Sequence, residues 1–253
     1  MSKAKHRGLH AEALSKAAEI GVKSQLEKAD KVDIDIDTDP LKLVQGEVNS
    51  VEMRGEGLIT AQNLRLEEVL LKTDQIAINL LNVALGKVEL THPANAKARI
   101  TLTTADINRV LNSDYLRSLI QKLDFPLEKD TLTLFWEQGE CHLHGNNQLT
   151  LNAQLTAQLG KQTRLVAFSI LLRIDKEQKI YLEKGSYQEG KSLPLKVTIA
   201  ILEQVENLLK LRNLRLPTLA LDIDKIEITT EKIVLWAEAQ IEQIPNRENT
   251  LFR

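Results

Sequence analysis

The chain has 253 residues, of which 33 are basic and 35 acidic, and its formal net charge of −2 gives no reason to expect a nucleic-acid surface. Its one cysteine, Cys141, excludes an internal disulfide, and the sequence has no run of about 18 apolar residues that would span a membrane. Hydrophobic residues make up 43% of the chain but aromatic residues only 4%, so its apolar surface is mostly aliphatic. Such a surface can pack as an ordinary core or surround an apolar ligand.

The first eight residues are expected to form a basic, disordered tail. They lack the continuous apolar stretch of a secretory signal, so we expect the protein to be made and kept in the cytoplasm. Lys3, Lys5 and Arg7 either keep this tail soluble or attract it to anionic lipid, worth about 1 kcal/mol per charge near a membrane surface. The second interpretation predicts peripheral membrane contact, on the cytoplasmic face of a membrane.

The stretch from Leu9 to Leu26 predicts one helix with a narrow apolar stripe, suited to lie on a sheet. The stripe consists of Leu9, Ala13, Ala17 and Ile20, with Leu14, Ala18 and Val22 beside it.

The segment KVDIDIDTDPLKL places aspartates at alternate positions and raises the question of a calcium loop. Counted from Asp33, the sixth and twelfth positions should be Gly and Glu, but they are Thr38 and Val44. Alternation predicts instead a strand over 31–37 whose aspartates, Asp33, Asp35 and Asp37, project into water and bind no cation tightly. A second strand of this kind is predicted over Leu219 to Ile228.

Further strands are expected over 46–60, 64–71 and 73–80, and Gly55 and Gly57 indicate a bulge or bend in the first of them. Near Thr103 or Thr104 the periodicity becomes helical, and either threonine can cap a helix in which Ile107, Val110 and Leu111 share one face. Asn112 and Ser113 are expected to break this helix and cap a second segment.

The middle of the chain predicts long antiparallel hairpins. In Gln148 to Leu159 the odd-numbered residues are all Leu or Ala and the even-numbered ones are polar, over a length of about 36 Å, roughly twice that of a usual strand. The segment 163–174, a polar turn at 175–179 and a return strand to 187 follow.

A third helix is expected over 194–211, although its first residues also fit a strand, and two strands close the chain. Together these elements predict an α+β fold: an elongated, strongly bent antiparallel sheet or barrel with long strands and about three amphipathic helices that line or cover an apolar tunnel. We expect a single domain over 9–244, with short tails at 1–8 and 245–253.

Catalytic signatures are absent. The segment RGEGLIT lacks the third glycine of a dinucleotide site, and there is no Walker loop, zinc-protease helix or nucleophile elbow. In GECHLHG, His142 and His144 face the side opposite Cys141. A metal needs three or four ligands, so we favour an ordinary hairpin between Gly139 and Gly145 over a metal site.

Both tryptophans, Trp136 and Trp236, fall in predicted strands. We expect them to pack in the core with a partner for the indole N–H, and the alternative is a rim that touches membrane.

The segment from Glu52 to Leu116 resembles the bacterial LmeA-type phospholipid-binding proteins. The similar features are the strand entry Gly57–Leu58, the segment LEEVLLKTDQIAIN, and a motif in which Leu102, a threonine, Ala105 and Asp106 precede Ile107, Asn108 and Leu111. The resemblance extends over residues 9 to 241 and implies a barrel-like fold with an apolar tunnel that holds lipid, similar to tubular lipid-binding domains. It implies no catalysis, and we interpret Asp106 and Asn108 as elements of a helix start. Family members are often exported or membrane-anchored, and we expect this chain to differ from them in lacking a signal.

We therefore expect a non-catalytic protein that binds and transfers phospholipid or another acyl lipid, with no cofactor and no nucleic-acid partner. The alternative is a scaffold protein whose interior is simply packed, and an enzyme is the third hypothesis. The residues expected to share the apolar interior are Ile76, Ile78, Leu102, Ile107, Val110, Leu111, Leu151, Leu155, Phe168, Ile170, Ile201 and Val205.

Overall fold

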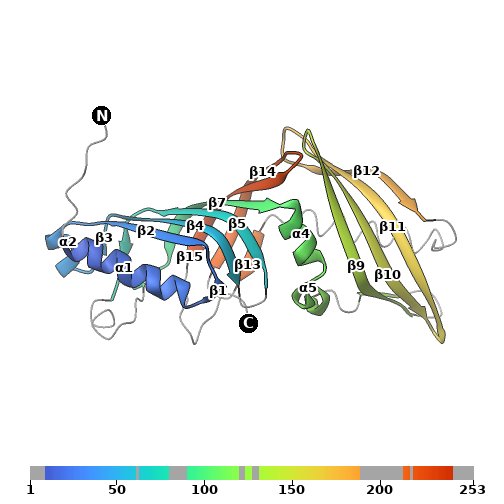
Figure 1. The fold of residues 1–253 in the computed structure, drawn as a ribbon, viewed down its shortest axis with the longest axis horizontal. Coiled ribbons are helices and arrows are strands. Elements are labelled where there is room, and N and C mark those ends of the chain that lie inside the picture. The colour runs from blue at the N-terminus through green and yellow to red at the C-terminus, as the bar shows by residue number, and fades with distance from the viewer. Residues whose placement is uncertain are drawn as a thin grey trace. The chain divides into compact units, whose positions relative to one another are not determined.

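The computed structural model describes residues 9–60, 63–79, 90–119, 123–126, 131–188, 213–216 and 219–241. The chain forms two compact units. Unit 1 comprises residues 1–101, 213–225 and 235–253, and unit 2 comprises 102–212 and 226–234. Figure 1 shows the strands and helices of both. The domain boundaries expected from the sequence stay a prediction.

Three antiparallel sheets contain all the strands of the described ranges. An eight-stranded sheet has the order β1-β4-β5-β7-β15-β14-β13, and β2 also pairs with β4. Its strands are β1 (Leu26–Lys28), β2 (Lys31–Asp37), β4 (Ser50–Thr60), β5 (Arg65–Thr73), β7 (Ala94–Thr103), β13 (Asn213–Leu216), β14 (Leu219–Ile228) and β15 (Lys232–Ile241). A short pair joins β3 (Glu47–Val48) to β6 (Ile76–Ala77).

The third sheet belongs to unit 2 and has the order β12-β11-β10-β9-β8. Its strands are β8 (Leu123–Pro126), β9 (Thr131–Gly145), β10 (Gln148–Leu159), β11 (Gln162–Ile174) and β12 (Ile180–Tyr187). The predicted long antiparallel strands are thus confirmed. Over the described residues neither large sheet closes into a barrel, so of the two predicted architectures the open sheet is present.

Four helices are described: α1 (Leu9–Lys23), α2 (Pro40–Val44), α4 (Thr104–Leu111) and α5 (Asp114–Leu119). The helix predicted over 194–211 lies outside the described residues. Helix α2 was not expected from the sequence; it follows β2 closely, and Asp39 is its N-cap. The Asp39 carboxylate accepts hydrogen bonds from the backbone N–H groups of Leu41 and Lys42, at 3.0 and 2.9 Å.

The aspartate-rich strand β2 has the predicted alternation. Val32, Ile34 and Ile36 are buried in the core of unit 1. On the other face Asp33 is exposed, while Asp35 and Asp37 are half-buried, so projection fully into water holds only for the first. Within the described part of the chain no three His, Cys, Asp or Glu side chains are grouped so that they could hold a metal ion. Weak or no cation binding here stays a prediction.

Gly57 provides the bend expected in β4. Its φ of 58° lies in the left-handed region that favours glycine. A Cβ at this position would lie 2.0 Å from Asp30 Oδ2, so a side chain has no room. The strand can therefore turn sharply between its pairing with β2 and its pairing with β1.

Helix α1 exists as predicted, but the predicted buried stripe was partly wrong. Ile20 is 69% exposed and Ala13 and Ala17 are exposed, whereas Ser15 and Glu19 are buried. The reason is the neighbour of the helix: α1 lies along β2 (Figure 1), and two of its side chains accept hydrogen bonds from backbone N–H groups of that strand. Ile36 N–H donates to Ser15 Oγ at 3.2 Å, and Ile34 N–H donates to Glu19 Oε1 at 3.5 Å.

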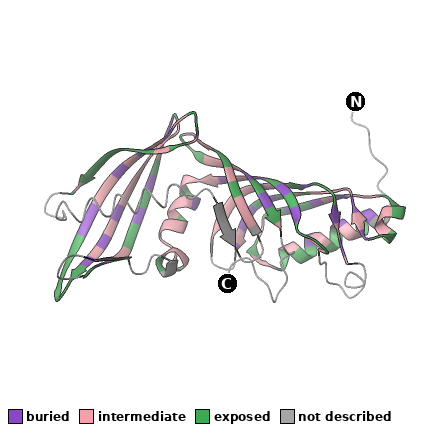
Figure 2. Ribbon diagram, turned by 180° about the vertical axis from the view of Figure 1, so that it is seen from behind, coloured by how far each residue is buried: buried purple, intermediate pink, exposed green. Residues whose placement is uncertain are grey.

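The core of unit 1 lies where the remaining α1 side chains meet the sheet. Leu14, Ala18 and Val22 pack against the buried residues of β2, β4 and β5. Figure 2 shows the buried residues as separate purple bands along the strands, as expected when alternate side chains face a core. Helix α1 thus packs apolar side chains into the core and accepts hydrogen bonds from the edge of β2.

Glu19 should make the free energy of unfolding depend on pH in the acidic range. Burial raises its pKa, but hydrogen bonds from Lys16 Nζ and the Ile34 amide, with the charges of Lys16 and Lys23, outweigh burial and hold the pKa below its ordinary value. The ionised Glu19 therefore contributes to the stability of the fold. This contribution is complete above the ordinary pKa of a glutamate and is lost as the pH falls through the lowered pKa of Glu19. We expect Glu19→Gln to cost about 1 kcal/mol of unfolding free energy at neutral pH and less in acid, measured by urea titration.

The control is Glu12→Gln, which removes the same charge from an exposed position of α1 and should change stability by only a few tenths of a kcal/mol at either pH. An equal loss for both variants, or a Glu19→Gln cost that does not shrink in acid, would contradict the assignment.

Candidate functional site

The candidate site is one side of the unit 2 sheet. Residues directly opposite each other in antiparallel strands share a face, and Leu151 lies opposite Ile170 while Leu155 lies opposite Val166. We call this side the apolar face. Its members on β9, β10 and β11 include Leu132, Leu134, Cys141, Leu151, Ala153, Leu155, Ala157, Val166, Phe168, Ile170 and Leu172.

The two sides of β10 differ sharply in chemistry. Val166 is 0% exposed on the apolar face, and Leu134 and Leu155 are also buried. The opposite side of β10 presents Asn152, Gln154 and Thr156, and none of these is buried. The period-two pattern of Gln148 to Leu159 therefore has the predicted physical basis.

Sequence reasoning missed the part that β9 contributes to the apolar face. Trp136 lies opposite Leu155, and Gln138 lies opposite Gln154, so Glu137 is one extra residue, a bulge. Apolar residues are even-numbered before the bulge, as at Leu134, and odd-numbered after it, as at Cys141. Because the alternation changes phase at the bulge, the sequence pattern does not indicate one continuous strand over Thr131–Gly145. For this reason the predicted hairpin between Gly139 and Gly145 was wrong.

The turn after β9 lies just beyond Gly145. Asn146 and Asn147 have φ values of 51° and 58°, the left-handed pair typical of a two-residue hairpin. Asn147 also accepts a hydrogen bond from Ile228 N–H through its Oδ1 at 2.9 Å, which ties the turn to β14.

Helix α4 docks on the free edge of β9 through two asparagines one helical turn apart. Asn108 Oδ1 accepts from Cys141 N–H at 2.6 Å and its Nδ2 donates to Cys141 O at 3.3 Å. Asn112 does the same with Gly139, accepting at 3.2 Å and donating at 2.7 Å. β8 pairs only with the first residues of β9, so these side chains provide partners where β9 has no neighbouring strand among the described residues.

The start of α4 is fixed by a capping box. Thr103 is the N-cap, its Oγ1 accepts from Asp106 N–H at 3.2 Å, and the buried Asp106 carboxylate accepts from Thr103 N–H at 2.9 Å. Ser113 Oγ accepts from Leu116 N–H at 3.1 Å and so begins α5 as predicted. Asp106 thus fits its predicted role, but Asn108 is a docking residue and not part of the helix start.

Trp136 lies on the apolar face opposite Leu155 and contacts helix α4. Its indole N–H donates to Leu111 O at 2.8 Å, the kind of partner expected for a packed tryptophan. A Cβ at Gly139 would lie 2.5 Å from the Trp136 ring and 3.2 Å from Leu111 Cβ. Gly139 is therefore needed for the ring and helix to come this close. The other tryptophan, Trp236, has Lys225 Nζ 4.5 Å from its ring centroid.

The predicted interior residues divide between the two units. Leu151, Leu155, Phe168 and Ile170 lie together on the apolar face. Leu111 touches Trp136 beside it, and Leu102, Ile107 and Val110 are half-buried in unit 2. Ile76 and Ile78 are buried in the core of unit 1. Ile201 and Val205 lie outside the described residues, as do Lys3, Lys5 and Arg7. The lipid-binding role of the whole set stays a prediction.

The histidines of β9 face away from the apolar face, as predicted. His144 Nε2 lies 2.7 Å from Thr150 Oγ1, and His142 Nε2 lies 3.3 Å from Glu140 Oε2, both at exposed positions. Cys141 on the opposite side is 2% exposed, and burial raises the pKa of its thiol to about 11. A thiol in this state is a poor nucleophile at neutral pH.

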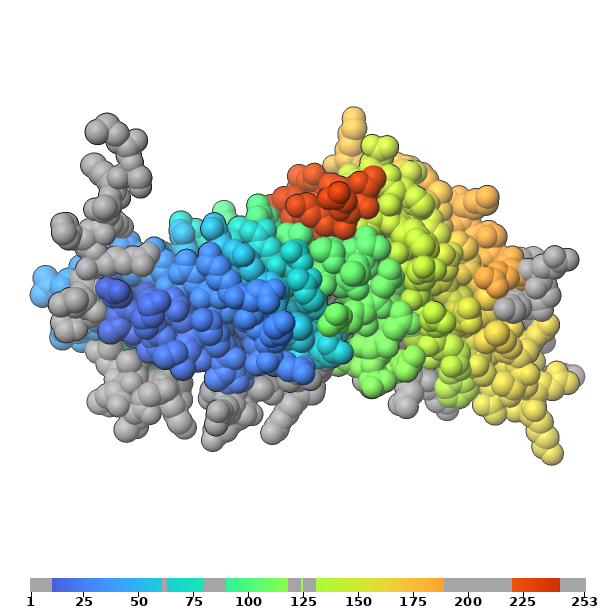
Figure 3. Space-filling model, viewed as in Figure 1, coloured from blue at the N-terminus to red at the C-terminus, as the bar shows by residue number. Residues whose placement is uncertain are grey.

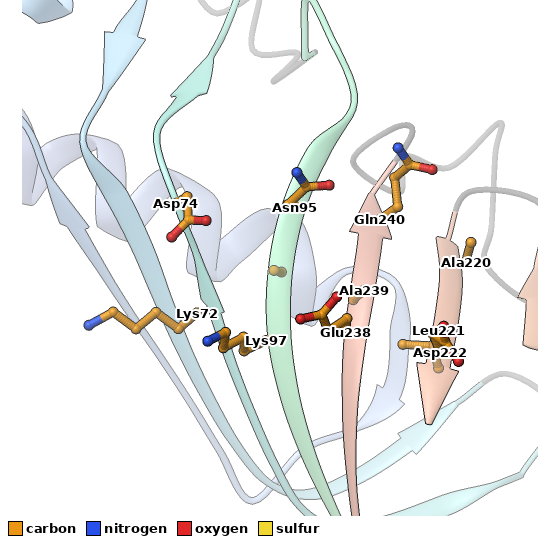
Figure 4. A pocket seen from close by; sticks show the side chains of 11 residues that line it. Lys72, Asp74, Asn95, Lys97, Ala220, Leu221, Asp222, Glu238, Ala239 and Gln240 are labelled. Carbon is orange, nitrogen blue, oxygen red and sulfur yellow. The ribbon is translucent and has the colours of Figure 1, made fainter. Parts of the chain in front are cut away.

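Unit 1 has a separate open hollow of about 640 Å³ between β5, β7, β15 and β14 (Figure 4). Its lining includes both signs of charge, from Lys72, Lys97, Asp222 and Glu238, together with small residues such as Ala96 and Ala239. Lys72 forms an ion pair with Glu52. The hydrogen bond and the negative charge of Glu52 raise the pKa of Lys72, and desolvation opposes this effect only in part. None of the predicted lipid-binding residues lines this hollow. Its polar lining does not suit acyl chains, so the apolar face remains the better candidate for them.

No helix in the described ranges has the length and apolar character needed to cross a bilayer. The sequence model of the LmeA-like phospholipid-binding family matches residues 7–238. The chain belongs to this family. The match contains the apolar face, α4 and α1, so the elements that position the candidate site all lie within the family region. Comparison with curated proteins and with solved structures gives no match.

Asn108→Ala should loosen the docking of α4 and expose Cys141. The variant leaves the N–H and C=O of Cys141 without their partner, at a cost of about 1–3 kcal/mol of unfolding free energy. We expect the wild-type thiol to react slowly with a disulfide reagent at neutral pH and the variant to react several-fold faster. Ala105→Ser, at an exposed position of the same helix, is the control. Equal labelling rates in all three proteins would show that α4 does not protect this edge.

Proposed function

We propose that the protein binds phospholipid without catalysis and carries it to or from a membrane, with the acyl chains lying along the apolar face. The family is a phospholipid-binding family and not a known enzyme family. The observation that carries the proposal is the continuity of the apolar face over three long strands. Every position of this face on β10 is Leu or Ala, most positions on β11 are Val, Phe, Ile or Leu, and β9 adds Leu, Trp, Gly and Cys.

The energetics favour an acyl ligand on such a surface. Each CH₂ group removed from water contributes about 0.8 kcal/mol, and an acyl chain needs no hydrogen-bond partner along its length. The polar groups that β9 would otherwise expose beside the face are already paired by Asn108 and Asn112. The proposal requires that the face be one wall of a tunnel wide enough for the chain.

The alternative is a scaffold protein in which the apolar face is covered entirely by packed side chains. Phe168 and Tyr187, with ring centroids 6.5 Å apart, and the buried cluster around Leu134 and Val166 are consistent with either interior. The two hypotheses differ in unfilled volume, because a packed core leaves no space larger than a water molecule.

Ala153→Phe separates the hypotheses, because it places a large apolar side chain at the centre of the face. If lipid occupies the space, we expect wild type to take up phospholipid and the variant to take up at least several-fold less, with little change in melting temperature. If the core is packed, the variant should instead lose about 1–3 kcal/mol of stability through overpacking. Native mass spectrometry measures the lipid, and thermal unfolding measures the stability.

The matched control is Asn152→Phe, the neighbouring position on the opposite side of β10. It should leave lipid uptake unchanged. A wild-type protein that takes up no phospholipid from vesicles, together with an Ala153→Phe variant that is destabilised, would favour the scaffold.

The basic tail is proposed to assist membrane encounter, and its residues lie outside the described ranges. Three charges at about 1 kcal/mol each give only weak, reversible attraction to anionic lipid. We expect deletion of residues 1–8 to reduce co-sedimentation with anionic vesicles at low salt while lipid uptake persists. Unchanged vesicle binding at low salt would show that the tail only aids solubility. The expected location, in the cytoplasm and peripheral on the cytoplasmic face of a membrane, stays a prediction.

A further inference from the structure

Helix α2 presents a small apolar patch to solvent. Leu41 and Val44, three residues apart on one turn, are each 78% exposed, and Pro40 beside them is also exposed. No residue of α2 is buried. Single exposed apolar side chains are common, whereas three adjacent ones on one helical turn form a contiguous apolar patch.

The patch is held in place by polar contacts on the other side of the turn. Asp39 caps the helix at its start, and Thr38 Oγ1 donates to Glu47 O at 2.9 Å. Lys42 Nζ donates to Asn49 Oδ1 at 2.7 Å, which directs this cation toward the body of unit 1. After the helix, Gly46 turns the chain with a φ of 77°. Leu41 and Val44 are therefore displayed by a fixed turn. Figure 1 labels α2, and in the space-filling view of Figure 3 the blue segment that contains it lies at the surface.

The size and charge of the patch indicate its partner. A specific protein interface buries about 1,000 Å² or more, far beyond what one short turn can supply. A bilayer needs no complementary shape, because single side chains can insert between lipid headgroups. The charged groups nearest in sequence are Asp37, Asp39, Lys42 and Glu47, three acidic and one basic, so attraction to anionic lipid cannot dominate.

We propose that α2 is a docking element that inserts Leu41 and Val44 into the surface of a phospholipid bilayer. This inference rests on the proposed function, since a lipid carrier must meet a membrane to exchange its ligand. It differs from attraction through the basic tail, because insertion is driven by apolar contact and is insensitive to salt.

The test is co-sedimentation with vesicles of pure phosphatidylcholine at low and high salt. We expect the double variant Leu41→Ser, Val44→Ser to bind at least ten-fold more weakly than wild type at both salt concentrations. The control is Ile20→Ser, which removes a 69% exposed apolar side chain from α1. It should bind as wild type does.

Vesicle binding that is unchanged in the double variant, or an equal loss in Ile20→Ser, would overturn the proposal. A wild-type dimer in sedimentation velocity that the double variant abolishes would also overturn it and would identify a second copy of the chain as the occupant. Lipid uptake by native mass spectrometry separates this proposal from the proposed function. The double variant should still take up phospholipid supplied in detergent, whereas absence of uptake in wild type with α2-dependent vesicle binding would refute only the lipid-carrying function.

Discussion

The backbone N–H and C=O groups at the edge of a sheet need hydrogen-bond partners, and at two sheet edges of this protein helix side chains supply them. Ser15 and Glu19 of α1 accept from the amides of β2, and Asn108 and Asn112 of α4 pair with the backbone of β9. An edge strand left open invites pairing with another chain. Closing the sheet into a barrel is one solution, and polar residues on docked helices are the one adopted at these two edges.

The same contacts explain the composition of the helices. A helix that lies against an edge needs short polar acceptors on its buried side, so Ser15 and Glu19 are buried while Ile20 is exposed. On α4 the asparagine amide is suited to both groups of one peptide, because it carries a donor and an acceptor in one plane. The polar requirement is met at the edge, and the side of the sheet beside it can remain aliphatic.

Because α4 side chains pair with the polar groups at the edge of β9, one side of the unit 2 sheet can remain apolar, as the proposed lipid ligand requires. Family membership supports a phospholipid ligand, and the apolar face offers long aliphatic strands. The charged hollow of unit 1 is separate from the apolar face. The Cys141 thiol lies on that face, but burial raises its pKa, so it is a poor nucleophile at neutral pH. The short helix α2 adds the reverse arrangement, in which polar groups face the protein and apolar groups face solvent.

The sequence alone determined those features that depend on near neighbours along the chain. Strict alternation fixed β2 and β10 to their observed ends, and the residues around Thr103 and Ser113 specified two caps, because a cap is a contact over three residues. The motif around Asp106 also indicated the family, since it is a local run of residues.

The tertiary structure decided what depends on distant partners. The bulge at Glu137 became evident only from pairing with β10, and it changed the phase by which β9 is read. Burial of Glu19 and the docking role of Asn108 depend on strands 15 and 33 residues away in the chain. The division of the predicted interior between two units has the same origin, because periodicity shows that a residue faces a core but not which core it faces.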